Sequence, residues 1–307
     1  IIDLAGEEFN LNSSQQLAVI LFDKLKLPMI KKRSTAEAVL SELKDKHPLP
    51  ELILSYRKLY KLKNTYLDPL PSYIVAETQR VHSSFNQTMT ATGRLSTSSP
   101  NFQNIPIRTE DGKEIRKAIK AQSNEYQIFS ADYSQVELRV MAHLSGDVSL
   151  ISALNNGEDI HTFTAKNIFN VDNDDMVLPE MRRIAKIVNF GIMYGAGPFR
   201  LSQELDIPFG EAKQIKDAYF EKYQGIEQYI ENSKLQIKET KSVETLLGRK
   251  RAVWDSDSQN KIRRDAAERM AINMPIQGTA AEMIKLAMIK IPVSYTHLRA
   301  HETLVNL

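Results

Sequence analysis

The sequence predicts an α+β fold that is mostly helical and carries a smaller set of strands. Apolar residues recur at helical spacing over residues 12–66 and again over residues 147–259. Between these blocks, residues 73–87 alternate apolar and polar side chains, a pattern typical of strands. Residues 88–106 are rich in Gly, Pro, Ser, Thr and Asn, which indicates a loop. A polar loop of this length inside a domain is usually functional or disordered.

Composition excludes several classes of function. The 307 residues contain no cysteine, so disulfides, thiolate zinc sites and thiol nucleophiles are excluded. No apolar run is long enough to span a bilayer, and the first residues do not resemble a signal peptide, so we expect a cytoplasmic protein. The net charge of +2 does not indicate nucleic-acid binding, which would therefore depend on local clusters of Lys and Arg. The start without Met suggests a fragment of a longer protein.

A first candidate site follows residues 126–131, a short apolar segment predicted to be a strand. The strand would end at Asp132, and a carboxylate held there projects into a cleft. The Asp132 carboxylate and the Tyr133 carbonyl are hard oxygens of the kind that Mg²⁺ prefers. Ser134 and Glu137 fit a capping box that starts the next helix. Taken alone, an Asp before a helix is more often a turn residue, and the capping box already accounts for Glu137.

A second candidate site lies on the helix predicted over residues 179–195, which Pro and Gly residues bracket. Four side chains recur at four-residue spacing and share one face of this helix. The two cations suit the oxygens of a triphosphate, and the two aromatic rings suit a base and its sugar. An amphipathic helix with a solvated basic end would not explain why charged and aromatic residues share a face. The four residues are Arg182, Lys186, Phe190 and Tyr194.

A third candidate site lies in the helical segment 262–291, which Pro275 is expected to interrupt. Here too polar side chains are spaced four apart, and such side chains can contact the acceptors that every base pair presents in the minor groove. The alternative is a polar helix surface. The members of this set are Arg269, Asn273 and Gln277, and the loop of residues 88–106 adds Arg94, Gln103 and Asn104, which suit sugar and base-edge contacts.

Five stretches together closely resemble family A of the DNA polymerases, the bacterial DNA polymerase I type. They occur in the order and at the spacing of that family, and the resemblance runs from the first residues to about Ile291. One such motif would be weak evidence, but five in order are specific. The stretches are Thr92–Ser96, Asn101–Arg108, Asp132–Arg139, Arg182–Gly195 and Gln277–Ala281.

The resemblance implies a right-hand polymerase fold with an antiparallel palm sheet that is incomplete here. It also implies a DNA-directed DNA polymerase, a nucleotidyltransferase that adds dNTPs to a primer 3′-hydroxyl and releases pyrophosphate in replication or repair. Primer–template DNA and dNTPs would be its partners, two Mg²⁺ ions its cofactors and a monomer its state. The implied parts are a partial thumb (1–67), the first part of the palm (68–146), the fingers (147–261) and a palm helix on the primer–template (262–291).

The resemblance also implies a role for each candidate residue. Asp132, with the Tyr133 carbonyl, would hold Mg²⁺, and Arg182 and Lys186 would act on the triphosphate in catalysis. Glu137 would be the steric gate against a ribose 2′-hydroxyl, which distinguishes this chain from the related single-subunit phage RNA polymerases. The remaining dNTP contacts would come from Gln135, His161, Phe190 and Tyr194, and the DNA contacts from Arg94, Gln103, Asn104, Arg269, Asn273 and Gln277.

In the family, Phe rather than Tyr at the position of Phe190 accompanies discrimination against dideoxynucleotides. The same discrimination is therefore expected here.

The chain departs from the family pattern after Ile291. A His-Asp-Glu turn, whose Asp is the second metal ligand, is expected there and is absent. Residues 292–307 are interpreted instead as a non-native tail, because Val293–Glu302 match the translation of a sequencing adaptor. His297, His301 and Glu302 in that tail are not interpreted as a metal site. The family also carries a few more residues between Lys32 and Ser34, and nothing corresponds to upstream nuclease domains.

The missing Asp leaves two alternatives for the exact chain. One is a catalytically inactive fragment that binds DNA and dNTPs, and the other is a chain that folds poorly. Binding to primer–template without extension would indicate the first alternative. Loss of cooperative thermal unfolding would indicate the second.

Overall fold

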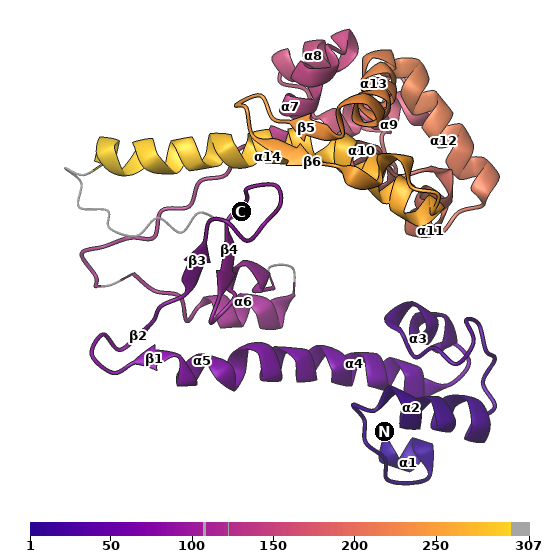
Figure 1. The fold of residues 1–307 in the computed structure, drawn as a ribbon. Coiled ribbons are helices and arrows are strands. Elements are labelled where there is room, and N and C mark those ends of the chain that lie inside the picture. Colours follow the sequence, from indigo (N-terminus) through magenta and orange to yellow (C-terminus); the bar gives the residue numbers. More distant parts are fainter. Residues whose placement is uncertain (107–108, 122, 296–307) are drawn as a thin grey trace. The chain divides into compact units, whose positions relative to one another are not determined.

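The structure is a computed structural model that describes residues 1–106, 109–121 and 123–295 (Figure 1). The chain forms two compact units. The first unit comprises residues 1–84 and 97–120, and the second comprises residues 85–96 and the chain from Ala121 onward. No helix among the described residues is both long and apolar enough to cross a membrane.

The first unit is built around helix α4 (Pro48–Leu62). The helix begins here because Pro48 occupies its first turn and the His47 side chain accepts a hydrogen bond from the Leu49 N–H. It continues into the π-helical turn η2 (Lys63–Leu67). The other helical elements are α1 (Ile2–Ala5), α2 (Ser14–Ala18), η1 (Val19–Lys24), α3 (Glu37–Leu43) and α5 (Pro69–Ser72). The largest buried side chains include Leu17, Leu21, Leu40, Leu49 and Ile53.

Short strands follow these helices, in the region where the sequence predicts them. β1 (Ile74–Val75) pairs antiparallel with β2 (Arg80–Val81). β3 (Ser84–Asn86) pairs with β4 (Ser96–Ser98) where the chain passes from one unit to the other. The 3₁₀ turn η3 (Phe102–Asn104) and helix α6 (Glu110–Arg116) complete the first unit. Apart from β4 and η3, the described part of residues 88–106 is the loop that its composition predicts.

The second unit is a helical body with one hairpin. Its core lies between α7, α9, α10, α12, α13 and α14, where Leu138, Met141, Ile160, Val188 and Tyr223 are buried. The helices are α7 (Val136–Ser145), α8 (Val148–Asn155), α9 (Ile160–Phe169), α10 (Pro179–Met193), α11 (Pro198–Leu205), α12 (Phe209–Lys222), α13 (Gln224–Thr240) and α14 (Lys261–Tyr295). The antiparallel hairpin is β5 (Ser242–Glu244) with β6 (Lys250–Ala252), and η4 (Asp174–Met176) and η5 (Trp254–Asp257) are 3₁₀ turns.

Two local predictions around Asp132 are wrong. Residues 126–131 do not form a regular strand, because within this segment Phe129 alone takes part in a β-bridge. The following helix begins at Val136 rather than at Ser134, and no side chain caps it. The residue before it, Gln135, has a left-handed φ of 54°, so the chain enters the helix through a turn and not through a capping box.

The predicted interruption at Pro275 is also wrong, because α14 runs continuously through that residue. A proline inside a helix removes one backbone donor and crowds the carbonyls of the preceding turn. The Tyr229 hydroxyl of α13 donates a 3.1 Å hydrogen bond to the Ile272 carbonyl in that turn. A neighbouring helix therefore supplies a donor where the proline disturbs the helix.

The expected boundaries of thumb, palm and fingers stay predictions. Of the predicted non-native segment, residues 292–295 continue the backbone of α14, and residues 296–307 lie outside the described part of the chain. His297, His301 and Glu302, which are not interpreted as a metal site, fall in that outer part. Arg108, the last residue of one of the five stretches, also lies outside the described residues.

Candidate active site

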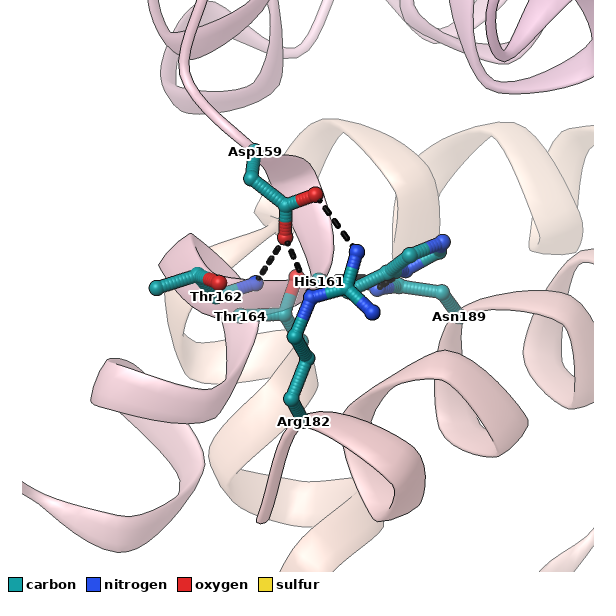
Figure 2. Close-up of polar contacts among 6 residues, drawn as sticks. All are labelled: Asp159, His161, Thr162, Thr164, Arg182 and Asn189. Carbon is teal, nitrogen blue, oxygen red and sulfur yellow. Dashed lines mark hydrogen bonds and ion pairs between the residues drawn. The ribbon is translucent and has the colours of Figure 1, made fainter. Parts of the chain in front are cut away.

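The basic end of α10 is joined to the start of α9 by an ion pair (Figure 2). Arg182 donates from Nε and from a terminal nitrogen to the two oxygens of Asp159, at 3.1 and 2.7 Å. Asp159 also caps α9, since one of its oxygens accepts the Thr162 N–H at 2.7 Å. Burial alone would raise the pKa of Asp159, but the hydrogen bonds from Arg182 and Thr162 outweigh burial and lower that pKa to about 2. The Asp159 carboxylate is therefore ionised at neutral pH.

His161 is the second residue of α9 and is buried. Its Nδ1 lies 3.1 Å from the side-chain nitrogen of Asn189, and its ring centroid lies 5.7 Å from that of Phe190. Burial lowers the pKa of His161, the Asp159 charge opposes this shift, and the charges of Arg182 and Lys186 add to it. The imidazole is therefore mostly neutral at pH 7, with its ring held by α10.

The aromatic end of α10 leads to a buried carboxylate. Phe190 and Tyr194 stack with their ring centroids 6.2 Å apart. The Tyr194 hydroxyl donates a 2.6 Å hydrogen bond to Glu137 of α7, a residue that is only 8% exposed. Burial, followed by the hydrogen bond to Glu137, raises the pKa of Tyr194 to about 12. Glu137 also forms an ion pair with Arg94, so its carboxylate is compensated within the site.

The predicted DNA-contacting face of α14 meets this end of α10. Gln277 lies close enough to the Tyr194 hydroxyl to lower the pKa of Tyr194, against the larger effects of burial and of Glu137. Gly195 has a left-handed φ of 73°, and a Cβ at this position would lie 2.9 Å from Cγ of Arg269, so the two helices approach closely. The Asn273 Oδ1 is buried and has no hydrogen-bond partner among the described residues. An unpaired buried acceptor is rare in folded proteins, so this atom is a notable exception within the face.

Lys186 differs from Arg182 although the two share a helix face. It is exposed, and within the described chain no ion pair or hydrogen bond engages its ammonium group. Its charge acts on His161, whose pKa it helps to lower. The two cations predicted to bind phosphate are therefore in different states: one is paired with a carboxylate and the other faces solvent.

Asp132 and Tyr133 are exposed and lie in irregular chain before α7. The described residues contain no group of three or more His, Cys, Asp or Glu residues that could hold a metal ion. Mg²⁺ nevertheless binds commonly through one or two carboxylates and completes its shell with water and substrate phosphates. The Asp132 carboxylate and the Tyr133 carbonyl suit one ion of that kind.

Two of the predicted DNA contacts, Gln103 and Asn104, belong to the first unit. Gln103 and Asn104 form part of η3. The Gln103 amide oxygen accepts the Thr97 N–H at 3.2 Å, and the Asn104 carbonyl accepts the Tyr66 hydroxyl. Their backbone is therefore fixed by the surrounding loop and by the η2 turn.

Sequence reasoning missed two residues of this site, Asp159 and Asn189. Asp159 directly precedes a helix, and a helix-cap pattern could have found it as a cap. Its pairing with Arg182 joins two different helices, and spacing within one segment carries no signal for such a contact. Asn189 lies on the opposite side of α10 from solvent, where it contacts both His161 and Thr164.

Comparison with known proteins identifies the family. The model of DNA polymerase family A matches residues 1–306. The chain belongs to DNA polymerase family A.

Relatives in this family include the thermostable DNA polymerase I of Thermus thermophilus, which is 51% identical over 95% of this chain and 35% of its own length. The DNA polymerase I of Bacillus subtilis is 48% identical over 94% of this chain and 33% of its own length. The chain thus spans about a third of the length of these family A relatives.

A solved structure has the same fold. It is described as the POL domain of Pol1 from M. smegmatis in complex with DNA primer-template and dNTP. It matches with a TM-score of 0.88 and 41% identity over 96% of this chain and 53% of that chain. The predicted right-hand polymerase fold, mostly helical with small antiparallel sheets, is thereby confirmed. The matches do not favour the alternative of an inactive DNA- and dNTP-binding fragment.

Proposed function

We propose that this chain carries out DNA-directed DNA synthesis in replication or repair, adding dNTPs to a primer 3′-hydroxyl with release of pyrophosphate. The observation that carries the proposal is the single face of α10, where Arg182 and Lys186 precede the stacked pair Phe190 and Tyr194. Membership of family A and the DNA- and dNTP-bound state of the M. smegmatis Pol1 domain support the same activity.

In this proposal the two cations of α10 bind the triphosphate. Arg182 offers a planar fork that matches a phosphate edge, and Lys186 adds a point charge one turn away. Holding the nucleotide in this way places its α-phosphate for attack by the primer and avoids the entropic cost of a free encounter. In this proposal His161, whose lowered pKa keeps it mostly neutral at pH 7, would donate a hydrogen bond to a phosphate oxygen.

Phe190 and Tyr194 would contact the new base pair, and Glu137 would exclude ribonucleotides. The Glu137 carboxylate is fixed from two sides by Tyr194 and Arg94, so it cannot readily turn away from an added 2′-hydroxyl. We therefore propose Glu137 as the steric gate, with Gln135 in the adjoining turn as a further dNTP contact. The primer–template contacts are Arg94, Gln103, Asn104, Arg269, Asn273 and Gln277.

Asp132 and the Tyr133 carbonyl are proposed to hold Mg²⁺. When bound, the ion would neutralise phosphate charge and polarise the reacting oxygens. The residues of this chain would orient the substrates around it. We also propose that the chain acts as a monomer in the bacterial cytosol, in line with its bacterial relatives, and size-exclusion chromatography with light scattering tests the monomer.

Primer extension with dNTPs and Mg²⁺ tests the activity. The chain should extend a labelled primer, and Asp132→Ala and Arg182→Ala should each lower the rate by more than about a hundredfold. Glu180→Gln, which changes an exposed carboxylate paired with Arg183, serves as the matched control and should keep the wild-type rate. Binding of primer–template without extension by the wild-type chain would contradict the proposal.

Sugar selection provides a second test that is specific to Glu137. Glu137→Ala should raise ribonucleotide incorporation relative to deoxynucleotide incorporation by more than about tenfold, because the bulk that excludes the 2′-hydroxyl is gone. Glu137→Gln keeps that bulk and should retain most of the exclusion. If wild type and Glu137→Ala select deoxynucleotides over ribonucleotides equally well, Glu137 is not the steric gate.

A further inference from the structure

Arg182 is already bound by an anion that belongs to the protein. Both of its donors that face α9 are taken by the Asp159 carboxylate, at 2.7 and 3.1 Å (Figure 2). Lys186, one turn further along the same face of α10, carries no such partner within the described chain. A triphosphate that binds both side chains therefore finds Lys186 without a partner among the described residues, but it must displace Asp159 from Arg182.

Asp159 is held in a way that lets it release Arg182. It accepts the Thr162 N–H at 2.7 Å and stands at the N-terminus of the ten-residue helix α9, where the helix dipole favours a negative charge. These interactions remain when Arg182 leaves, so the carboxylate does not become an unpaired buried charge. The side chains of Arg182 and Asp159 are 46% and 39% exposed, so a ligand can reach the pair.

We propose that Asp159 is an internal competitor for the nucleotide triphosphate, holding Arg182 in the ligand-free protein and yielding it when phosphate binds. This inference rests on the proposed function, because it assumes that Arg182 binds the triphosphate. The exchange is favoured for a polyphosphate because it offers Arg182 a bidentate partner of higher charge and engages Lys186 at the same time. Its consequence is that the measured affinity is lower than the affinity of the freed site, by the stability of the Asp159–Arg182 pair.

Asp159→Asn isolates the competition from the fold. Asparagine caps a helix about as well as aspartate, so α9 keeps its cap while the charge that holds Arg182 is lost. The probe is inorganic tripolyphosphate, titrated calorimetrically into the full 307-residue chain, which makes the readout independent of DNA, of base contacts and of catalysis. The dissociation constant of Asp159→Asn should be about two- to fivefold lower than that of the wild type, the range expected for an exposed ion pair.

Glu180→Gln is the matched control for this measurement. It removes a carboxylate that binds the neighbouring Arg183 at 2.5 and 2.8 Å, on the same first turn of α10. It changes the net charge by the same amount as Asp159→Asn. Any gain in tripolyphosphate affinity in Glu180→Gln should be less than about a third of the gain in Asp159→Asn. An equal gain in tripolyphosphate affinity in both variants would show that the loss of any nearby negative charge has this effect, and it would overturn the inference.

Arg182→Ala separates failure of this inference from failure of the proposed function. Combined with Asp159→Asn in a double-mutant cycle, it should abolish the gain, since Asp159 acts through Arg182. If Arg182→Ala alone leaves tripolyphosphate binding unchanged, the proposed phosphate role of Arg182 fails. If Arg182→Ala weakens binding but Asp159→Asn binds no tighter than wild type, the competitor role of Asp159 fails. Asp159→Ser, which also caps a helix, repeats the test should the Asn variant fold poorly.

Discussion

The Tyr194 hydroxyl donates a 2.6 Å hydrogen bond to the Glu137 carboxylate, although 57 residues separate the two along the chain. Arg94 binds the same carboxylate from a third segment. Three helices or loops therefore converge on a carboxylate that is only 8% exposed. Because the carboxylate is buried, an oxygen left without its donor has no water to replace it, so loss of one partner should be measurable as lost stability.

Tyr194→Phe removes the hydroxyl and keeps the ring that stacks on Phe190. We expect the free energy of unfolding to fall by about 1–2 kcal/mol, since the lost hydrogen bond goes to a buried carboxyl acceptor. Urea denaturation followed by circular dichroism measures this loss. Tyr73→Phe, at a tyrosine that is 38% exposed, is the control and should change stability by less than about 0.5 kcal/mol. Equal losses in the two variants would show that the Glu137 contact contributes nothing specific.

His161 should titrate below the usual range of histidine. Burial lowers its pKa, whereas the Asp159 charge raises it, so Asp159→Asn should lower the His161 pKa further. NMR titration of the imidazole C–H signals measures both values, with His161→Gln used for assignment. An unshifted His161 pKa in Asp159→Asn would mean that the Asp159 charge does not act on this ring.

The lowered pKa of His161 also makes the free energy of unfolding depend on pH. The folded-state pKa of His161 is lower than its unfolded value, so the folded protein binds fewer protons at this site. The stability that neutral His161 contributes is present above the unfolded pKa, about 6.5, and is lost as pH falls towards the folded pKa. Lowering pH from 7.5 to 5.5 should therefore destabilise the wild type more than His161→Gln in urea unfolding.

Much of this architecture follows from local sequence, because periodicity within one segment reports the face that a helix buries. Arg182, Lys186 and Phe190 lie on one helix, α10, that starts at Pro179, as their spacing predicts, and Tyr194 is the residue that caps its C-terminal end. The start of α7 was not predictable in this way. The start of α7 has no side-chain cap hydrogen bond. The sequence predicts Glu137 as part of a capping box, but in the structure Glu137 contacts Arg94 and Tyr194 instead. Tertiary contact outweighed the local pattern.

The pairing of Asp159 with Arg182 could not be predicted for a related reason. Each residue has a local explanation, the first as a helix cap and the second as a cation on an exposed face. Their bond depends on the packing of α9 against α10, which brings together residues 23 positions apart. The hydrogen bond from Tyr229 of α13 to the Ile272 carbonyl, in the turn before Pro275, is likewise a contact between two helices that spacing within one segment does not predict.

Gly278 in α14 should resist a substitution that usually stabilises helices. A Cβ at Gly278 would lie 2.5 Å from Cγ2 of Thr245. Thr245 cannot turn away without losing the 2.7 Å hydrogen bond from its hydroxyl to Glu282. Gly278→Ala should therefore lower the free energy of unfolding by about 1–3 kcal/mol, as overpacking does.

A matched glycine and a rescue variant test this explanation. At Gly210 of α12, no heavy atom of the described chain beyond its sequence neighbours and its own helix backbone lies within 4 Å of the would-be Cβ, so Gly210→Ala should stabilise by about 0.5–1 kcal/mol. Thr245→Ser removes Cγ2 and keeps the hydroxyl, so it should recover most of the loss in the Gly278→Ala background. Thermal unfolding of the wild type, Gly278→Ala, Thr245→Ser and the double variant measures the cycle. Failure of Thr245→Ser to rescue would place the clash elsewhere.

The Tyr229 hydroxyl should be needed for α14 to pass Pro275 without fraying. Tyr229 is partly buried, and its hydroxyl donates 3.1 Å to the Ile272 carbonyl, in the turn that the proline crowds. Tyr229→Phe leaves that carbonyl without this donor, so we expect a loss of about 0.5–1.5 kcal/mol. Amide exchange should also quicken locally in α14 around Ile272 more than in α12, because the weakened turn opens without unfolding the whole unit. Uniformly quickened exchange across α12 and α14 would instead show that Tyr229 supports general packing, and unchanged exchange would show that the helix passes the proline without its help.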